Sequence, residues 1–221
     1  MARAPPLPAG PWLRRALRRA ALAAALLATS APGCRDWRRG VDPARARSEP
    51  EQVLVDGQPP IDLEAKGHQI RLSPRATYRI TGYAVETSRK LLDEWDFVLP
   101  MDLALVWGPV ADPEVLSHMK FHLSRRYVSW WADSSTPPAV VRLLPSHVAN
   151  NHLIPADEAV ARDLDGIRVG DLVTLRGLLV DVEIRDGGGR VVHRSATSLT
   201  RDDVGSGACE QMWVEKAEVE R

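Results

Sequence analysis

The chain has 221 residues, and its 44% hydrophobic and 26% charged residues are ordinary for one globular domain plus a leader. Its 29 basic and 29 acidic residues balance, but residues 1–33 hold five arginines and no acidic residue, which leaves 24 basic against 29 acidic residues in the remainder. This net negative charge argues against nucleic acid as a partner. Two cysteines are too few for a disulfide scaffold.

The N-terminal leader predicts export from the cytoplasm. Four arginines between positions 14 and 19 precede an apolar run at residues 20–28, which is shorter than the ~20 residues of a membrane-spanning helix. Small residues then lead to Cys34, in a pattern that resembles the lipobox of bacterial lipoproteins. We therefore predict a signal peptide over residues 1–33 and lipidation of Cys34, which would anchor the protein to the periplasmic face of a bacterial membrane.

Other outcomes remain open for the leader. Cleavage near Cys34 without lipidation and retention as an uncleaved anchor are the alternatives, and an oxidising compartment would also permit a Cys34–Cys209 disulfide. Residues 34–50 are rich in Arg, Asp, Pro and Ala and are expected to form a flexible tether. The sequence does not distinguish the inner from the outer membrane.

Residues 51–221 are expected to form a single β-rich domain, because short apolar runs alternate with Gly and Pro. Two short helices are predicted, one capped by Asp112 and ending near His118, the other capped by Asp157 and ending near Leu164. The fold class is mainly β, a small barrel or barrel-like sheet, and the pattern over residues 170–182 resembles the opening of OB-like barrels. The expected strands cover residues 53–55, 61–63, 68–72, 76–85, 103–107, 119–123, 127–131, 140–144, 172–176, 178–185, 191–194 and 212–219.

The first polar cluster covers residues 146–152. His147 and His152 could hold Zn²⁺ with a third ligand or serve in catalysis, although their spacing is not that of a helical zinc motif. Asn150 and Asn151 favour a turn within a loop, since Asn side chains bond to their own backbone, and they are candidate binding residues.

The second polar cluster covers residues 197–210. Cys209 is a candidate nucleophile if His147, His152 or His193 lowers the pKa of its thiol, and otherwise a small buried apolar residue. Asp202 and Asp203 are candidate cation ligands without EF-hand spacing. Arg201 is a candidate binding residue.

Two further features are weaker. His118 and His122 have the spacing of a helical metal pair, but a strand is expected over residues 119–123. Trp130 and Trp131 could form an aromatic platform, although neighbouring strand residues point to opposite faces, so only one of them, with Trp131 as the binding candidate, should be exposed.

Four segments, residues 102–108, 146–157, 169–181 and 197–215, are similar to a set of uncharacterised bacterial exported proteins. The resemblance implies a genuine domain and transfers no activity. No motif specifies a reaction, a ligand or a cofactor. The first hypothesis is a non-enzymatic envelope lipoprotein that binds a protein partner or a small ligand. The alternatives are an envelope hydrolase or thiol enzyme, with Cys209 and a histidine in one cleft, and a metal-binding module.

Overall fold

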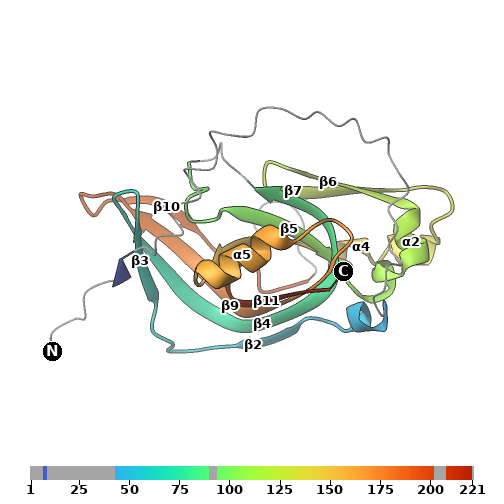
Figure 1. Ribbon diagram of the computed structural model, residues 1–221, viewed down its shortest axis with the longest axis horizontal. Helices are drawn as coiled ribbons and strands as arrows, with labels where there is room; N and C mark the ends of the chain where they lie inside the picture. Colours follow the sequence, from blue (N-terminus) through green and yellow to red (C-terminus); the bar gives the residue numbers. More distant parts are fainter. Residues whose placement is uncertain (1–6, 9–42, 90–93, 202–207, 221) are drawn as a thin grey trace.

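A computed structural model describes residues 7–8, 43–89, 94–201 and 208–220. Strands dominate it, and the central sheet curves into a closed but uneven ring (Figure 1). This confirms the mainly β, barrel-like prediction. The signal peptide and Cys34 lie outside the described residues, and none of the helices in the described ranges is long and apolar enough to cross a membrane.

Five strands form the ring in the order β4–β5–β8–β11–β9, and β9 pairs again with β4 to close it. All of these pairs are antiparallel except β8–β11. A Greek-key ring of five strands is the arrangement of an OB-like barrel. The ring strands are β4 (His68–Arg89), β5 (Met101–Val106), β8 (Val148–Pro155), β9 (Leu172–Arg185) and β11 (Glu210–Glu220).

Two of these strands are longer than the sequence predicted. The runs at 68–72 and 76–85 are one strand, β4, because a register shift between Pro74 and Ala76 accommodates the proline, which has no N–H to donate to the ladder. Gly177 lies inside β9, where a Cβ atom would collide with the backbone carbonyl of Trp213. The glycine is therefore a point of close approach between β9 and β11, not the end of a strand.

The helix α5 (Glu158–Gly166) follows β8 and confirms the second predicted helix. Asp157 caps it by accepting hydrogen bonds from the backbone N–H groups of Ala159 and Val160. Val160 and Leu164 on its inner face pack into the main core of the barrel. The first predicted helix is α2 (Pro113–Ser117), which follows the 3-10 helix η3 (Gly108–Ala111) and is capped by Asp112.

Two predictions for residues 140–152 were wrong. The strand expected at 140–144 is replaced by the helices α3 (Pro138–Val141) and α4 (Leu144–His147), each with a proline in its first turn, where the missing N–H costs nothing. The loop expected to hold Asn150 and Asn151 is strand β8, which is buried on both faces. Burial between two layers outweighs the low β-propensity of Asn and His.

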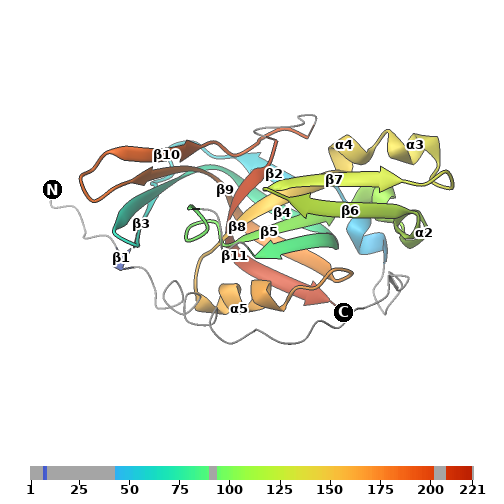
Figure 2. The same cartoon turned by 90° about the horizontal axis from the view of Figure 1, so that it is seen from above.

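A separate hairpin, β6 (Met119–Ser124) and β7 (Tyr127–Ala132), lies between β5 and β8 in the chain. Arg125 and Arg126 form its tight turn with positive φ angles of 48° and 66°. Figure 2 shows this hairpin with α2, α3 and α4 at one end of the molecule, and β3 and β10 at the other. The inner face of the hairpin packs on the second core cluster through Phe121 and Trp130, whereas Trp131 is 57% exposed, as strand alternation predicts.

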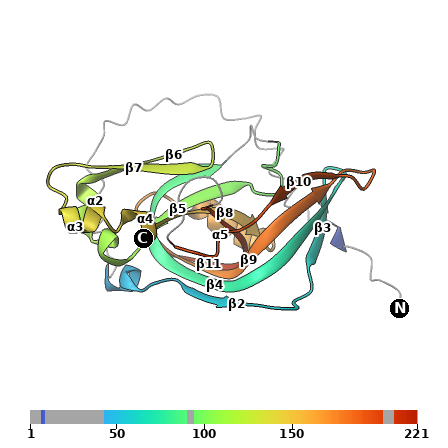
Figure 3. The ribbon, with the colours of Figure 1, turned by 180° about the vertical axis from the view of Figure 1, so that it is seen from behind.

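The remaining elements extend the sheet. Residues 43–50 belong to the predicted tether, yet Ala46 is fully buried and Glu49 accepts a hydrogen bond from the indole Nε1 of Trp107 (3.0 Å). The segment therefore packs against the domain upstream of residue 51. Figure 3 shows β2 along the outer side of β4, and β3 beside the far end of β4. These elements are β1 (Leu7–Pro8), η2 (Pro43–Arg47), β2 (Glu51–Leu54), β3 (Ile61–Ala65) and β10 (Val191–Ser195).

Candidate functional site

A cavity of about 260 Å³ lies under the turn of the β6–β7 hairpin, with His152 on β8 and Gln211 on β11 in its wall. The segment before β5 and the segments around β10 and the start of β11 complete the wall. The lining residues are Trp95, Leu99, Arg125, Arg126, Tyr127, His152, His193, Ser195, Ala196, Cys209 and Gln211.

A buried Asp–His pair forms the centre of the site. Asp102 on β5 and His152 on β8 are register partners, and the imidazole Nδ1 lies 2.9 Å from the carboxylate Oδ1. Asp102 is fully buried, and His152 is 8% exposed. Because an ionised carboxylate can only accept, the neutral imidazole carries its proton on Nδ1, and Nε2 is an acceptor. Within the described part of the chain, Nε2 has no hydrogen-bond partner.

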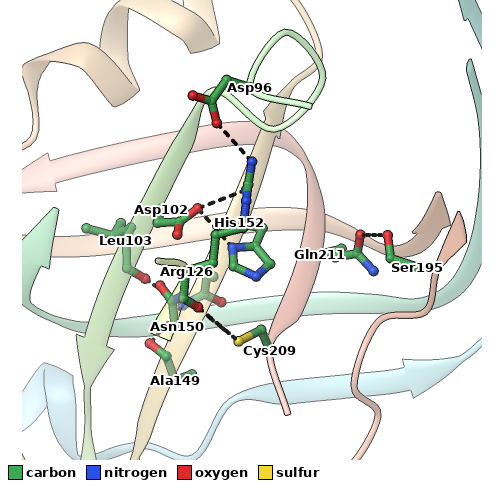
Figure 4. A network of polar contacts seen from close by, with 11 residues as sticks. Asp96, Asp102, Leu103, Arg126, Ala149, Asn150, His152, Ser195, Cys209 and Gln211 are labelled. Carbon is green, nitrogen blue, oxygen red and sulfur yellow. Dashed lines mark hydrogen bonds and ion pairs between the residues drawn. The ribbon is translucent and has the colours of Figure 1, made fainter. Parts of the chain in front are cut away.

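Arg126 holds the hairpin turn over the sheet. Its Nη2 lies 3.0 Å from Asp96, and its Nη1 lies 3.4 Å from the same oxygen of Asp102 that His152 contacts. Figure 4 shows this network, with the guanidinium between the two carboxylates. The guanidinium side chain is only 17% exposed, and the paired carboxylates provide the compensation that a buried charge requires.

Cys209, directly before β11, presents its thiol to the same cavity. The Sγ lies 3.6 Å from the backbone carbonyl of Arg126, to which it donates, and 3.9 Å from the Nδ2 of Asn150. Asn150 is buried and also donates to the Arg126 carbonyl at 2.7 Å. Asn150 thus connects the hairpin turn, the thiol and strand β8.

A second hydrogen-bonded chain orients Gln211. Ser195 donates to the Oε1 of Gln211 (2.6 Å) and receives a hydrogen bond from the Nε2 of His193 (3.1 Å). This fixes the amide so that its NH₂ group is the part left to donate into the cavity. Trp95 stacks on His193 with ring centroids 4.8 Å apart and adds an aromatic wall.

The structure brings together only some of the residues that the sequence nominated. His152, Cys209 and His193 share the cavity, but His147 lies outside its lining. The Nδ1 of His147 is 3.0 Å from the carbonyl of Leu143, and its Nε2 is 3.1 Å from Glu49. The histidines that remain candidates to act with Cys209 are therefore His152 and His193, which line the same cavity.

The other nominated binding residues lie elsewhere. Asn151 points to the opposite face of β8 and donates to the carbonyl of Leu103, and Trp131 is outside the cavity lining. Arg201 lies 3.6 Å from Glu210 and over the ring of Tyr78. Burial is the largest cause that raises the pKa of Tyr78 well above its usual value, which keeps its phenol neutral.

No three His, Cys, Asp or Glu side chains are grouped to hold a metal within the described ranges. His118 pairs with Asp133 at 3.1 Å, and His122 lies on strand β6 rather than on a helix. Asp202 and Asp203 lie outside the described residues. Among the described residues, the structure therefore assembles no set of ligands for the metal-binding hypothesis.

Sequence reasoning missed three residues of the site: Asp102, Arg126 and Gln211. Asp102 left a signal, since a lone carboxylate within an otherwise apolar run is buried only if it is paired. Arg126 and Gln211 gave no such signal, because one occupies an ordinary hairpin turn and the other an ordinary strand start.

Comparisons with protein-family models, with curated proteins and with solved structures found no match. The resemblance to bacterial exported proteins stays a prediction, and the site must be interpreted from its own geometry.

Proposed function

We propose that this is an exported, lipid-anchored binding protein whose barrel holds a small polar ligand in the cavity beside His152. The observation that carries the proposal is a pair of buried, oriented side chains, His152 and Gln211, that line one cavity. His152 offers an acceptor at Nε2, and Gln211 offers its amide N–H groups, while the opposite ends of both side chains are fixed by Asp102 and Ser195.

These two groups suggest which ligand atoms would fit. Both atoms face the cavity, so a ligand group that donates to His152 and accepts from Gln211 would pair with both in place of water. Hydroxyl groups next to a carbonyl, primary amides and hydroxy acids have this pairing. His152 and Gln211 are register partners on β8 and β11, which places the two groups side by side.

The size and place of the cavity support a small-molecule site. Its volume of about 260 Å³ lies just under the usual range for ligand pockets, which suits a ligand of a few heavy atoms or one end of a longer molecule. It lies between the sheet and the turn of the β6–β7 hairpin, where Arg125 and Arg126 line it. Trp95 and Tyr127 provide the apolar surface that such pockets combine with a few fixed polar groups.

The export and anchoring part of the proposal rests on the leader. Acylation of Cys34 would hold the domain at the membrane through several chains. Cys34→Ser should move the protein from the membrane fraction to the soluble envelope fraction, as assayed by fractionation and blotting. Continued membrane association of this variant would contradict the lipoprotein assignment.

The binding proposal is tested with the purified full chain in detergent. A panel of small amides, hydroxy acids and sugars is screened by ligand-observed NMR, with wild type, Gln211→Leu and the surface control His118→Gln compared. We expect to find compounds that bind wild type and His118→Gln, and that bind Gln211→Leu at least about 10-fold more weakly. The reason is that the loss of one polar partner removes roughly 1.4 kcal/mol or more of binding free energy. Hits that bind all three proteins equally would place the ligand elsewhere.

A further inference from the structure

We infer that the cavity also carries covalent acyl-transfer chemistry, with Cys209 as nucleophile, His152 as general base, Gln211 as donor to the substrate carbonyl oxygen, and a short-chain ester or thioester as substrate. This goes beyond reversible binding, and it uses the same cavity as the proposed function. The inference rests on three chemically complementary side chains that line one cavity at the start of the β8–β11 pair.

Strand pairing and the cavity bring these groups together. Gln211 lies opposite His152 in the parallel β8–β11 pair. Cys209 lies directly before β11, and its side chain lines the same cavity. All three line the cavity, and in Figure 4 the imidazole lies between Asp102 on one side and Cys209 and Gln211 on the other.

Asp102 gives His152 the state that a general base needs. The carboxylate fixes the proton on Nδ1, so Nε2 enters the cavity with its lone pair available. After His152 has taken a proton, the buried carboxylate stabilises the imidazolium that forms. Asp102 does not line the cavity, and its role is to position His152.

Cys209 is held near the base in a resting position. Its S–H donates to the Arg126 carbonyl over 3.6 Å, and an N–H of Asn150 points at the sulfur from 3.9 Å. Both contacts are long, and a turn about the Cα–Cβ bond redirects the sulfur within the cavity. Catalytic contacts are commonly loose before substrate binds, so this geometry is compatible with the role. The Asn150 amide would stabilise the thiolate once it forms.

The reaction balances with water as the only co-reactant. His152 Nε2 takes the thiol proton, and Cys209 Sγ bonds to the carbonyl carbon, whose oxygen becomes negative and accepts from Gln211. The intermediate collapses, the bond to the leaving alcohol or thiol breaks, and the leaving group takes the proton from His152. Water then loses a proton to His152 and attacks the acyl-cysteine, which releases the carboxylic acid and restores the thiol.

The walls restrict the acyl group. Leu99, Trp95 and Tyr127 give an apolar end to a cavity of about 260 Å³, which accommodates a short acyl chain. Among the described residues, no acidic side chain lines the cavity, and a substrate that carries a carboxylate or phosphate beyond the ester would meet Arg125.

The test uses the full chain with p-nitrophenyl acetate as the probe, quenched in acid and mapped by peptide mass. Acetyl should appear on the peptide that holds Cys209 in wild type and in the control His118→Gln. His152→Gln should slow the labelling by about 10²-fold or more, and Gln211→Leu by about 10²-fold, while both keep a cooperative melting transition.

Absence of acetyl from the Cys209 peptide of wild type would overturn the inference, as would equal labelling rates in wild type and His152→Gln. If His152→Gln does not fold, the rate in Gln211→Leu decides in the same way. Reversible binding is read separately in Cys209→Ser by NMR. Retained binding there, with no acetylation in wild type, would overturn the acyl chemistry and leave the binding function standing.

Discussion

Strands β5 and β8 bury both of their faces, and the two faces hold different kinds of side chain. On one face, Leu103 and Leu153 join the main core under α5. On the other, Asp102, Asn150 and His152 form the polar network below the hairpin turn of Arg126. The alternation of a β-strand thus separates an apolar core from a polar site by a single residue.

The two faces of β5 and β8 differ in what they contribute to the stability of the fold. The apolar face encloses the barrel, so its side chains contribute mainly to folding. The polar face retains a cavity beneath the inserted β6–β7 hairpin, and burial of its polar groups costs stability unless they are paired. Four substitutions test this division, beginning with the largest expected effect.

Leu103→Ala should destabilise the fold most, by about 2–5 kcal/mol, because a fully buried leucine of the main core leaves a cavity when truncated. The free energy of unfolding from urea denaturation measures this loss. Leu54→Ala on the exposed side of β2 is the matched control and should stay within about 0.5 kcal/mol of wild type. Equal losses in the two variants would contradict the assigned core.

Asp102 is the neighbour of Leu103 and lies on the polar face. Asp102→Asn should lower the free energy of unfolding by about 2 kcal/mol. The variant weakens charge-assisted hydrogen bonds to His152 and Arg126, but Asp96 still compensates the guanidinium. Urea denaturation gives the stability. A loss under about 0.5 kcal/mol would mean that the buried network contributes nothing to folding.

Gln211→Leu should change stability by less than about 1 kcal/mol, since the substitution removes one neutral hydrogen bond to Ser195 and keeps the volume of the side chain. Ligand binding and acetylation should nevertheless decline strongly. The contrast between a nearly unchanged melting temperature and a lost function would identify the polar face as the site. A variant that melts much earlier than Asp102→Asn would instead assign Gln211 a structural role.

Glu183→Gln should give the smallest effect and a distinct pH dependence. Hydrogen bonds from Arg194, then from Arg185, hold the pKa of Glu183 below its usual value. A lowered folded-state pKa means that the stabilisation is present above the unfolded pKa and is lost as pH falls through the folded value. Wild type should therefore melt slightly above the variant at neutral pH, and the two should converge as pH falls through the folded-state pKa of Glu183. A difference in melting temperature that widens in acid would contradict the lowered pKa of Glu183.

The sequence was sufficient for the fold class and for the two capped helices, because Asp112 and Asp157 act through local hydrogen bonds. Predictions from the sequence were wrong where tertiary contacts determine the local structure. The run at 140–144 looks like a strand until its flanking prolines start short helices, and Asn150 looks like a turn residue until β8 is buried on both sides.

The candidate site was predicted only in part for the same reason. Cys209 and His152 were nominated by residue type, and they do share a cavity. Which histidine accompanies the thiol depends on the parallel pairing of β8 with β11, a contact between distant segments that no local pattern encodes. His147 was an equal candidate from sequence and lies against Glu49 instead.

The most direct test of the central claim is the protonation of the His152 imidazole, measured by NMR on the full chain with ¹⁵N-labelled histidine. We expect a neutral ring with a slowly exchanging, downfield Nδ1 proton, and an Nε2 signal that shifts when a ligand enters the cavity. Asp102→Asn should remove the downfield proton. A proton on Nε2, or an Nδ1 proton that Asp102→Asn does not affect, would contradict the assignment of His152 as an oriented acceptor in a functional cavity.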